Sequence, residues 1–210
     1  MYNSVFIHIP KTAGTYITVA LNIESLALPR QRGDFKQTGN VTFGHQDYAK
    51  LVGMGIISKE FDNNSFKYTF CRNPFDRAVS HFFYAKRRHP EILNRKTSFL
   101  EFTKNLHLYK RYPKQVGRFG GVLAFRPQCE CITGVNIDFI GHLETLREDL
   151  EKISKIIGTG IKDVPVKNRN VTEHAHYSHY YDQESEENIK NFYAVDFERF
   201  GYDNRLLSIF

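Results

Sequence analysis

A lysine followed by small residues and a glycine stands near the start of the chain, at residues 11–15 (Lys-Thr-Ala-Gly-Thr). It comes after a short apolar run, residues 5–9, and Pro10, and residues with helical spacing follow it. Backbone N–H groups at such a turn between a strand and a helix bind anions, and phosphate above all. The common nucleotide-triphosphate loop ends in Gly-Lys-Ser/Thr, whereas here Lys11 precedes the small residues. The segment therefore predicts a site for a phosphate-containing cofactor. Its order of residues differs from that of the usual ATP-binding loop.

A second candidate for anion binding is residues 71–80 (Cys-Arg-Asn-Pro-Phe-Asp-Arg-Ala-Val-Ser). Arg72 comes where an apolar strand stops, and Ser80 lies two turns into the helix expected next. An arginine fork and a hydroxyl can serve one phosphate together, the arginine through two parallel hydrogen bonds. The alternative is structural: Arg72 would pair with Asp76, and Ser80 would be merely exposed on the helix.

The elements that must position these residues alternate along the chain. Strands are expected at 5–9, 41–43, 66–71 and 137–141, and helices at 14–26, 46–54, 74–88, 98–108, 144–157 and 183–193. Asn73 is expected to cap its helix, with Pro74 at the first position and Asp76 in the first turn. Residues 109–128 and 158–181 are expected to be irregular, and an aromatic tail closes the chain. This order predicts one domain over residues 1–210, an α/β three-layer fold of the P-loop type with a central, mainly parallel sheet flanked by helices. Ligands in such sheets bind at the carboxyl ends of the strands.

The composition narrows the classes of partner. The chain has 210 residues and a formal net charge of +6, which suits an anionic cofactor or an acidic acceptor. The basic residues are dispersed and no motif that reads nucleic acid is present, so we expect no nucleic-acid partner. No apolar run approaches the roughly 20 residues of a membrane span, and no signal peptide is visible. With three cysteines and no disulfide pattern, the expected location is the cytoplasm.

Taken together, the two anion motifs resemble those of a known family. Residues 9–15 resemble the 5′-phosphosulfate loop of sulfotransferases, and residues 72–80 resemble their 3′-phosphate motif. The form is similar to the carbohydrate (membrane-type, family 2) sulfotransferases, whose ending is also similar to residues 181–202. Residues 91–126 match no motif of that family.

The resemblance implies 3′-phosphoadenosine 5′-phosphosulfate (PAPS) as cofactor, with no metal. Lys11 would contact the 5′-phosphate and the bridging oxygen that leaves. Backbone amides would come from Thr12, Ala13, Gly14 and Thr15, with a hydroxyl from Thr15, and the 3′-phosphate would be bound by Arg72 and Ser80. Residues 164–170 are similar to a late loop that closes over the cofactor, through Lys167 and Arg169. A tyrosine at 177, 180 or 181 would stack on adenine or on a sugar.

A base is also needed to take the proton of the acceptor. His45 lies in residues 42–46 (Thr-Phe-Gly-His-Gln), after a short strand, and family members carry a similar Gly-His segment with the catalytic histidine in it. His45 is therefore the predicted general base. His142, at the end of another strand, is the rival, and His8 is expected to pack within its strand. The three histidines of residues 174–179 have a spacing that could bind a metal, although we expect these residues to form a solvated loop.

The residues are also compatible with two other functions. One is a nucleotide kinase or ATPase with a variant phosphate loop, which would need magnesium. The other is a non-catalytic binder of anionic glycans on the same fold. The basic clusters at 86–89 and 110–111 would either form a solvated face or dock an anionic acceptor. The acceptor, a small molecule or a glycan, is not identified by the sequence, and neither is the oligomeric state.

Overall fold

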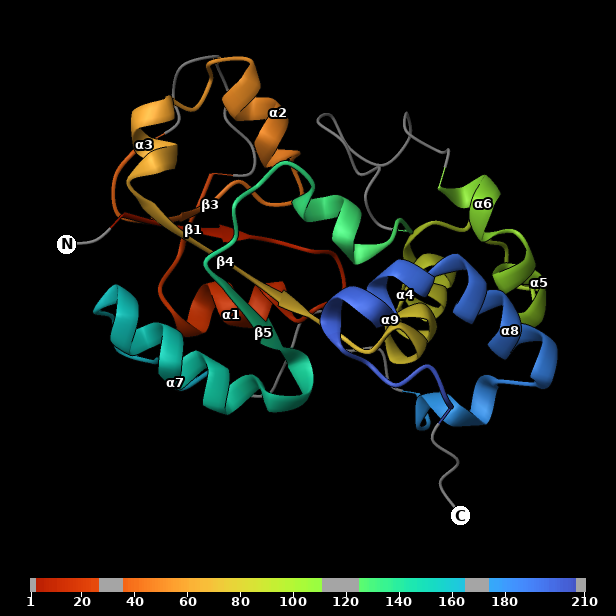
Figure 1. Ribbon diagram of the computed structural model, residues 1–210. Coiled ribbons are helices and arrows are strands. Elements are labelled where there is room, and N and C mark those ends of the chain that lie inside the picture. Colours follow the sequence, from red (N-terminus) through yellow and green to blue (C-terminus); the bar gives the residue numbers. More distant parts are fainter. Residues whose placement is uncertain (1–2, 27–35, 111–124, 165–173, 207–210) are drawn as a thin grey trace.

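A five-stranded parallel sheet forms the centre of the molecule (Figure 1). The structure, a computed structural model, describes residues 3–26, 36–110, 125–164 and 174–206. The strands are β1 (Asn3–Ile7), β2 (Glu24–Ser25), β3 (Asn40–Thr42), β4 (Ser65–Cys71) and β5 (Phe139–His142), in the spatial order β2-β3-β1-β4-β5. Every pairing between neighbours is parallel. The predicted α/β fold is therefore confirmed, and the ends of β1, β3 and β4 lie side by side at one edge.

Two helices cover one face of this sheet (Figure 1). They are α1 (Gly14–Ala20) and α7 (Leu146–Ile157), the latter preceded by the short helix η3 (Leu143–Thr145). Because side chains alternate along a strand, Phe6 of β1 and both Tyr68 and Phe70 of β4 point to this face, where they pack with Ile17 and Leu150.

The opposite face is covered by α2 (Tyr48–Gly53), α3 (Lys59–Asn63) and the short helix η2 (Gln128–Ile132). Val5 and Ile7 of β1, which alternate with Phe6, point to this side and pack against Leu51, Phe61 and Ile132. Both faces are thus buried, as the near-continuous apolar strands require.

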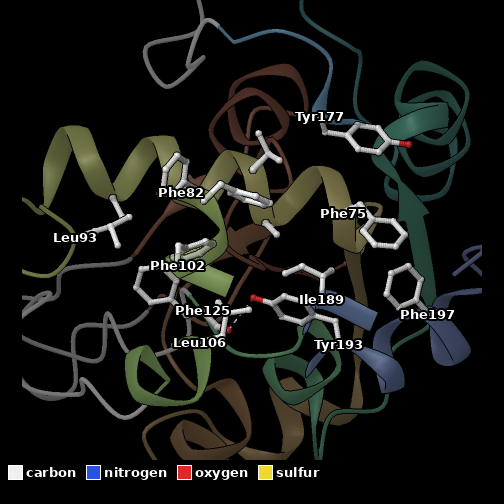
Figure 2. Packing of buried hydrophobic residues seen from close by; sticks show 14 residues of the cluster. Phe75, Phe82, Leu93, Phe102, Leu106, Phe125, Tyr177, Ile189, Tyr193 and Phe197 are labelled. Atoms are coloured by element: carbon white, nitrogen blue, oxygen red, sulfur yellow. Dashed lines mark hydrogen bonds between the residues drawn. The ribbon is translucent and has the colours of Figure 1, made fainter. Parts of the chain in front are cut away.

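Beyond the carboxyl ends of the strands lies a layer of helices built on aromatic residues. It consists of α4 (Pro74–Arg88), α5 (Phe99–Lys104), α6 (Leu106–Tyr109), η4 (Tyr177–Tyr180), α8 (Gln183–Phe192) and α9 (Ala194–Phe200). Figure 2 shows how Phe75, Phe102 and Tyr193 pack in its core. The buried Tyr193 hydroxyl donates to the carbonyl of Phe125 at 3.0 Å. The other helices of this layer pack against α4 and hold it, with the second anion motif, at the end of the sheet.

The first helix is shorter than the predicted range 14–26. It ends at Ala20, and residues 24–25 form β2 instead. Asn22 adopts a left-handed conformation with φ of 51°, and the N–H groups of Asn22 and Ile23 donate to the carbonyls of Val19 and Thr18. This is a Schellman ending with asparagine in the position that glycine usually takes. Asparagine tolerates this left-handed conformation, whereas the apolar spacing alone predicts that the helix continues to residue 26.

Other elements differ from their predicted form in detail. The predicted helix 98–108 is divided at Asn105 into α5 and α6, and the expected aromatic tail contains α9. The loop expected at 158–181 contains η4. By contrast, α4 has its predicted range, and the Asn73 side chain accepts from the N–H of Phe75 as a helix cap. Residues 111–124 and 165–173 lie outside the described residues.

Candidate active site

The loop between β1 and α1 has an unusual backbone. Lys11 and Ala13 are left-handed, with φ of 70° and 59°, which costs a non-glycine residue roughly 1–2 kcal/mol. The buried Thr12 hydroxyl donates to the Ile9 carbonyl at 2.9 Å and ties the turn together. Left-handed residues in a tight turn direct successive N–H groups into an anion-binding concavity. Strain of this kind is typical of ligand-binding segments.

The two anion motifs meet at the ends of β1 and β4. An Arg72 Nη1–H donates to the Lys11 carbonyl at 3.3 Å, and the buried Arg77 donates through Nε to the Pro10 carbonyl at 3.1 Å. Residues that are far apart in the sequence therefore form one surface, as the rule for parallel sheets predicted.

Arg72 also forms the ion pair that was the structural alternative. Its Nε and Nη2 atoms lie 2.8 and 2.7 Å from the two carboxylate oxygens of Asp76. An arginine has five N–H donors, so these contacts and the one to Lys11 leave two of them unused among the described residues. Ser80 is only 5% exposed, so the part of the structural alternative that has this serine merely exposed on the helix is wrong. Because Ser80 follows Asp76 by four residues, it lies on the same face of α4.

Gln128 is a site residue that the sequence did not reveal. Its fully buried side chain accepts from the Arg72 N–H at 3.0 Å and donates to the Arg72 carbonyl at 2.8 Å. The carboxylate of Asp196 in turn accepts from the N–H groups of Gln128 and Cys129, at 2.7 and 2.9 Å. The amide thus holds the backbone of Arg72 where β4 has ended. A contact across 56 residues has no local signal in the sequence.

Lys11 is surrounded by positive charge. Burial lowers the pKa of its ammonium group to about 8, and the charges of Arg72, Arg87 and Arg77 act in the same direction. The ammonium nitrogen lies 4.2 Å from the centre of the Tyr84 ring, a cation–π contact. An anion placed among these groups would relieve their mutual repulsion.

His45 follows β3 and lies beside the same loop. Its Nδ1 atom is 3.1 Å from the carbonyl oxygen of His8. Since a carbonyl only accepts, Nδ1 carries the hydrogen and Nε2 remains the acceptor nitrogen. Desolvation by the surrounding protein lowers the pKa of the imidazole, the His8 hydrogen bond raises it, and the charges of Lys11 and Arg77 lower it further. His45 retains solvent access, and the lowered pKa favours the neutral form that a base requires.

Gly14 is required by the position of His8. A Cβ atom at Gly14 would lie 1.7 Å from Nε2 of His8, so the imidazole must leave its place when a methyl group is added. We expect Gly14→Ala to lower the free energy of unfolding by about 1–3 kcal/mol, measured by chemical denaturation. Gly53→Ala is the matched control, because nothing lies within 4 Å of the Cβ atom that this substitution adds. Equal stabilities of the two variants would contradict the prediction.

The remaining histidines have other contacts. His142, the rival base, has its Nε2 atom 3.1 Å from the Phe200 carbonyl, in the packing between β5 and α9. His174 stacks on Phe83 with ring centres 5.3 Å apart, and the His176 Nδ1 atom lies 2.9 Å from the Ser178 hydroxyl. Among the residues that the structure describes, no group of three or more His, Cys, Asp or Glu side chains is placed to hold a metal.

The tyrosines expected to stack on the cofactor differ in burial and in the contacts that their side chains make. The Tyr181 hydroxyl donates to the Phe75 carbonyl at 2.8 Å, and its ring packs edge-on against Phe75 and Phe99. Tyr177 is buried, whereas Tyr180 is partly exposed and packs against Phe83. Lys167 and Arg169 lie outside the described residues.

The fold and this site place the chain among the α/β proteins that bind ligands at the carboxyl ends of parallel strands. A model of the sulfotransferase family matches residues 1–203, and the chain therefore belongs to that family, in its family 2 form. The predicted resemblance is confirmed, and the protein is a sulfotransferase enzyme. A comparison with individually curated proteins found no match. None of the helices in the described ranges has the length and apolar character needed to span a membrane.

Proposed function

We propose that the protein transfers a sulfuryl group from PAPS to a hydroxyl of a carbohydrate acceptor, with His45 as general base. The observation that carries the proposal is the meeting of Lys11, Arg72 and His45, whose pKa is lowered, at one edge of the sheet. Arg72 donates to the Lys11 carbonyl, and His45 contacts the carbonyl of His8, three residues before Lys11. Donor-binding and proton-accepting groups are therefore neighbours.

The charges of this region fit a donor that carries phosphate at both ends of a nucleoside. Lys11, Arg72, Arg77 and Arg87 interact electrostatically, and Asp76 is the carboxylate paired with Arg72. Lys11 and the amides of residues 12–15 would hold the 5′-phosphosulfate. Arg72 and Ser80, on the adjacent motif, would hold the 3′-phosphate. Asp76 would keep the guanidinium oriented while two of its N–H donors face the ligand.

The residues divide the chemical step between them. The acceptor oxygen forms a bond to sulfur while the bond from sulfur to the bridging phosphate oxygen breaks, and the acceptor proton passes to Nε2 of His45. Negative charge develops on the departing phosphate oxygen, and the ammonium of Lys11 would stabilise it more in the transition state than in the ground state. Desolvation lowers the pKa of His45 and so favours the unprotonated imidazole before the step. The other product is 3′-phosphoadenosine 5′-phosphate.

An anionic acceptor fits the exposed end of α4. In the cluster 86–89, Lys86 donates to the Thr97 carbonyl at 2.7 Å and His89 contacts Glu91. Lys110, from the second cluster, pairs with Glu130. Arg87 and Arg88 are exposed, and Arg87 is near enough to Lys11 to lower its pKa. We infer that these two arginines face an acidic group of the acceptor.

Calorimetric titration tests the donor. We expect 3′-phosphoadenosine 5′-phosphate to bind and ATP, with or without magnesium, not to bind. Arg72→Gln should weaken binding of the former by about 10- to 100-fold, because a charge-assisted contact to phosphate contributes about 1.5–3 kcal/mol.

Arg147→Gln is the matched control, since the Arg147 side chain is 93% exposed on α7. Its affinity should equal that of the wild type. Binding of ATP alone, dependent on magnesium, would contradict sulfuryl transfer and support a kinase.

A further inference from the structure

His8 occupies the space between the phosphate loop and the proposed base. It follows β1, and because it comes two residues after Phe6 it lies on the same side of the sheet as Phe6, the side of α1. Its ring stacks on the buried Phe6, with centres 5.4 Å apart. On another side the ring lies against Gly14 and fills the space that a Cβ atom at residue 14 would need. The third neighbour is the ring of His45, whose centre is 4.1 Å away at an interplanar angle of 47°.

Two different parts of His8 act on His45. The backbone carbonyl accepts from Nδ1–H and fixes the tautomer. The imidazole lies against one side of the His45 ring, with the centres 4.1 Å apart. Burial lowers the pKa of His8 well below its usual range, and the charge of the nearby His45 acts in the same direction. The charged groups that face His45 from other elements are Lys11 and Arg77.

We propose that His8 is a positioning residue, whose ring holds the His45 imidazole in place beside the phosphate loop with Nε2 as the proton acceptor. The proposal rests on the proposed function of His45 as base. It assigns to the His8 ring a steric role rather than a proton transfer, because no described residue forms a hydrogen bond with its nitrogens and its neighbours hold it by packing.

The first test observes His45 in the unliganded protein. Nitrogen-15 NMR of labelled histidine reports both the tautomer and the pKa, and the His45 signals are identified by their loss in His45→Gln. We expect the Nδ1–H tautomer in the wild type, with a pKa below 6.5. In His8→Ala we expect a pKa closer to 6.5 and a mixture of tautomers, because the ring is hydrated and free to turn. An unchanged tautomer and titration in His8→Ala would overturn the proposal.

The second test separates the shape of the ring from its nitrogens. His8→Phe keeps a ring without polar atoms, and His8→Asn keeps a polar group without a ring. We expect His8→Ala and His8→Asn to lower kcat about 10- to 100-fold, with donor affinity unchanged, since small misplacements at a reacting centre have effects of this order. His8→Phe should restore most of the rate. A fully active His8→Asn, or a His8→Phe as impaired as His8→Ala, would overturn the steric role.

The two proposals fail separately. If 3′-phosphoadenosine 5′-phosphate does not bind while NMR shows the expected effect of His8 on His45, the proposed function is wrong and the pairing of the histidines stands. If donor binding and turnover are found but His8→Ala leaves His45 unaltered, only the positioning role is lost. Thermal unfolding of each variant shows that the protein measured is folded.

Discussion

Lys11→Met should lower kcat by about 10²–10³-fold, the loss typical for removal of one group that stabilises developing negative charge. The reason is the site of the ammonium group, next to the left-handed turn and to Arg72, where the departing phosphate oxygen is expected. Steady-state rates at saturating donor measure the effect. Lys59→Met, an exposed position on α3, is the control and should keep the wild-type rate.

The same variant should alter how donor affinity depends on pH. In the free protein the pKa of Lys11 is about 8, and a bound phosphate raises it because opposite charges favour the ionised form. Affinity is therefore constant below pH 8 and falls as the pH rises above it, where binding requires uptake of a proton. In Lys11→Met this decline should disappear. A wild-type affinity that stays constant across pH 8 would contradict the assignment of Lys11 to the phosphate.

His45→Gln should lower kcat by about 10²–10⁴-fold, the range for loss of a general base, and leave the affinity for 3′-phosphoadenosine 5′-phosphate nearly unchanged. Because only neutral His45 accepts a proton, the wild-type kcat/KM should fall as the pH decreases through its lowered pKa, below 6.5. In the variant, kcat/KM should not show this decrease at low pH. His107→Gln, at an exposed position on α6, should retain both the rate and the pH profile. Normal turnover in His45→Gln would exclude His45 as the base.

The sequence predicts those parts of the fold whose signals are local. Asn73, Pro74 and Asp76 mark the start of α4, and all three occupy the predicted positions. The apolar runs of β1 and β4 predict buried parallel strands, and strand ends at one edge bring Lys11 and Arg72 together. The end of α1 does not follow from the apolar spacing, because Asn22, rather than glycine, provides the left-handed residue.

The contacts that orient the site residues come from distant parts of the chain. Neither the hydrogen bonds of Gln128 to Arg72 nor the contact of His45 with the His8 carbonyl follows from spacing, because each joins residues 37 to 56 positions apart. The pairing of Arg72 with Asp76 lies within one turn, and the spacing of the two residues predicts it as the alternative to phosphate binding. The structure shows that the ion pair exists, and the unused donors of the guanidinium leave both roles compatible.

The hydrogen bonds between Asp196, Gln128 and Arg72 have a consequence for the order of folding. Arg72 is supported by Gln128, and Gln128 is supported by a carboxylate on α9, 68 residues further along the chain. During synthesis, which proceeds from the N-terminus, the first motif and its strand emerge long before α9 exists. The nascent chain can therefore form the Lys11 turn early, but the arginine beside it acquires its support only when residue 196 has left the ribosome. On the proposed role of Arg72, competence to bind the donor is thus expected to be a late event in the biogenesis of this enzyme.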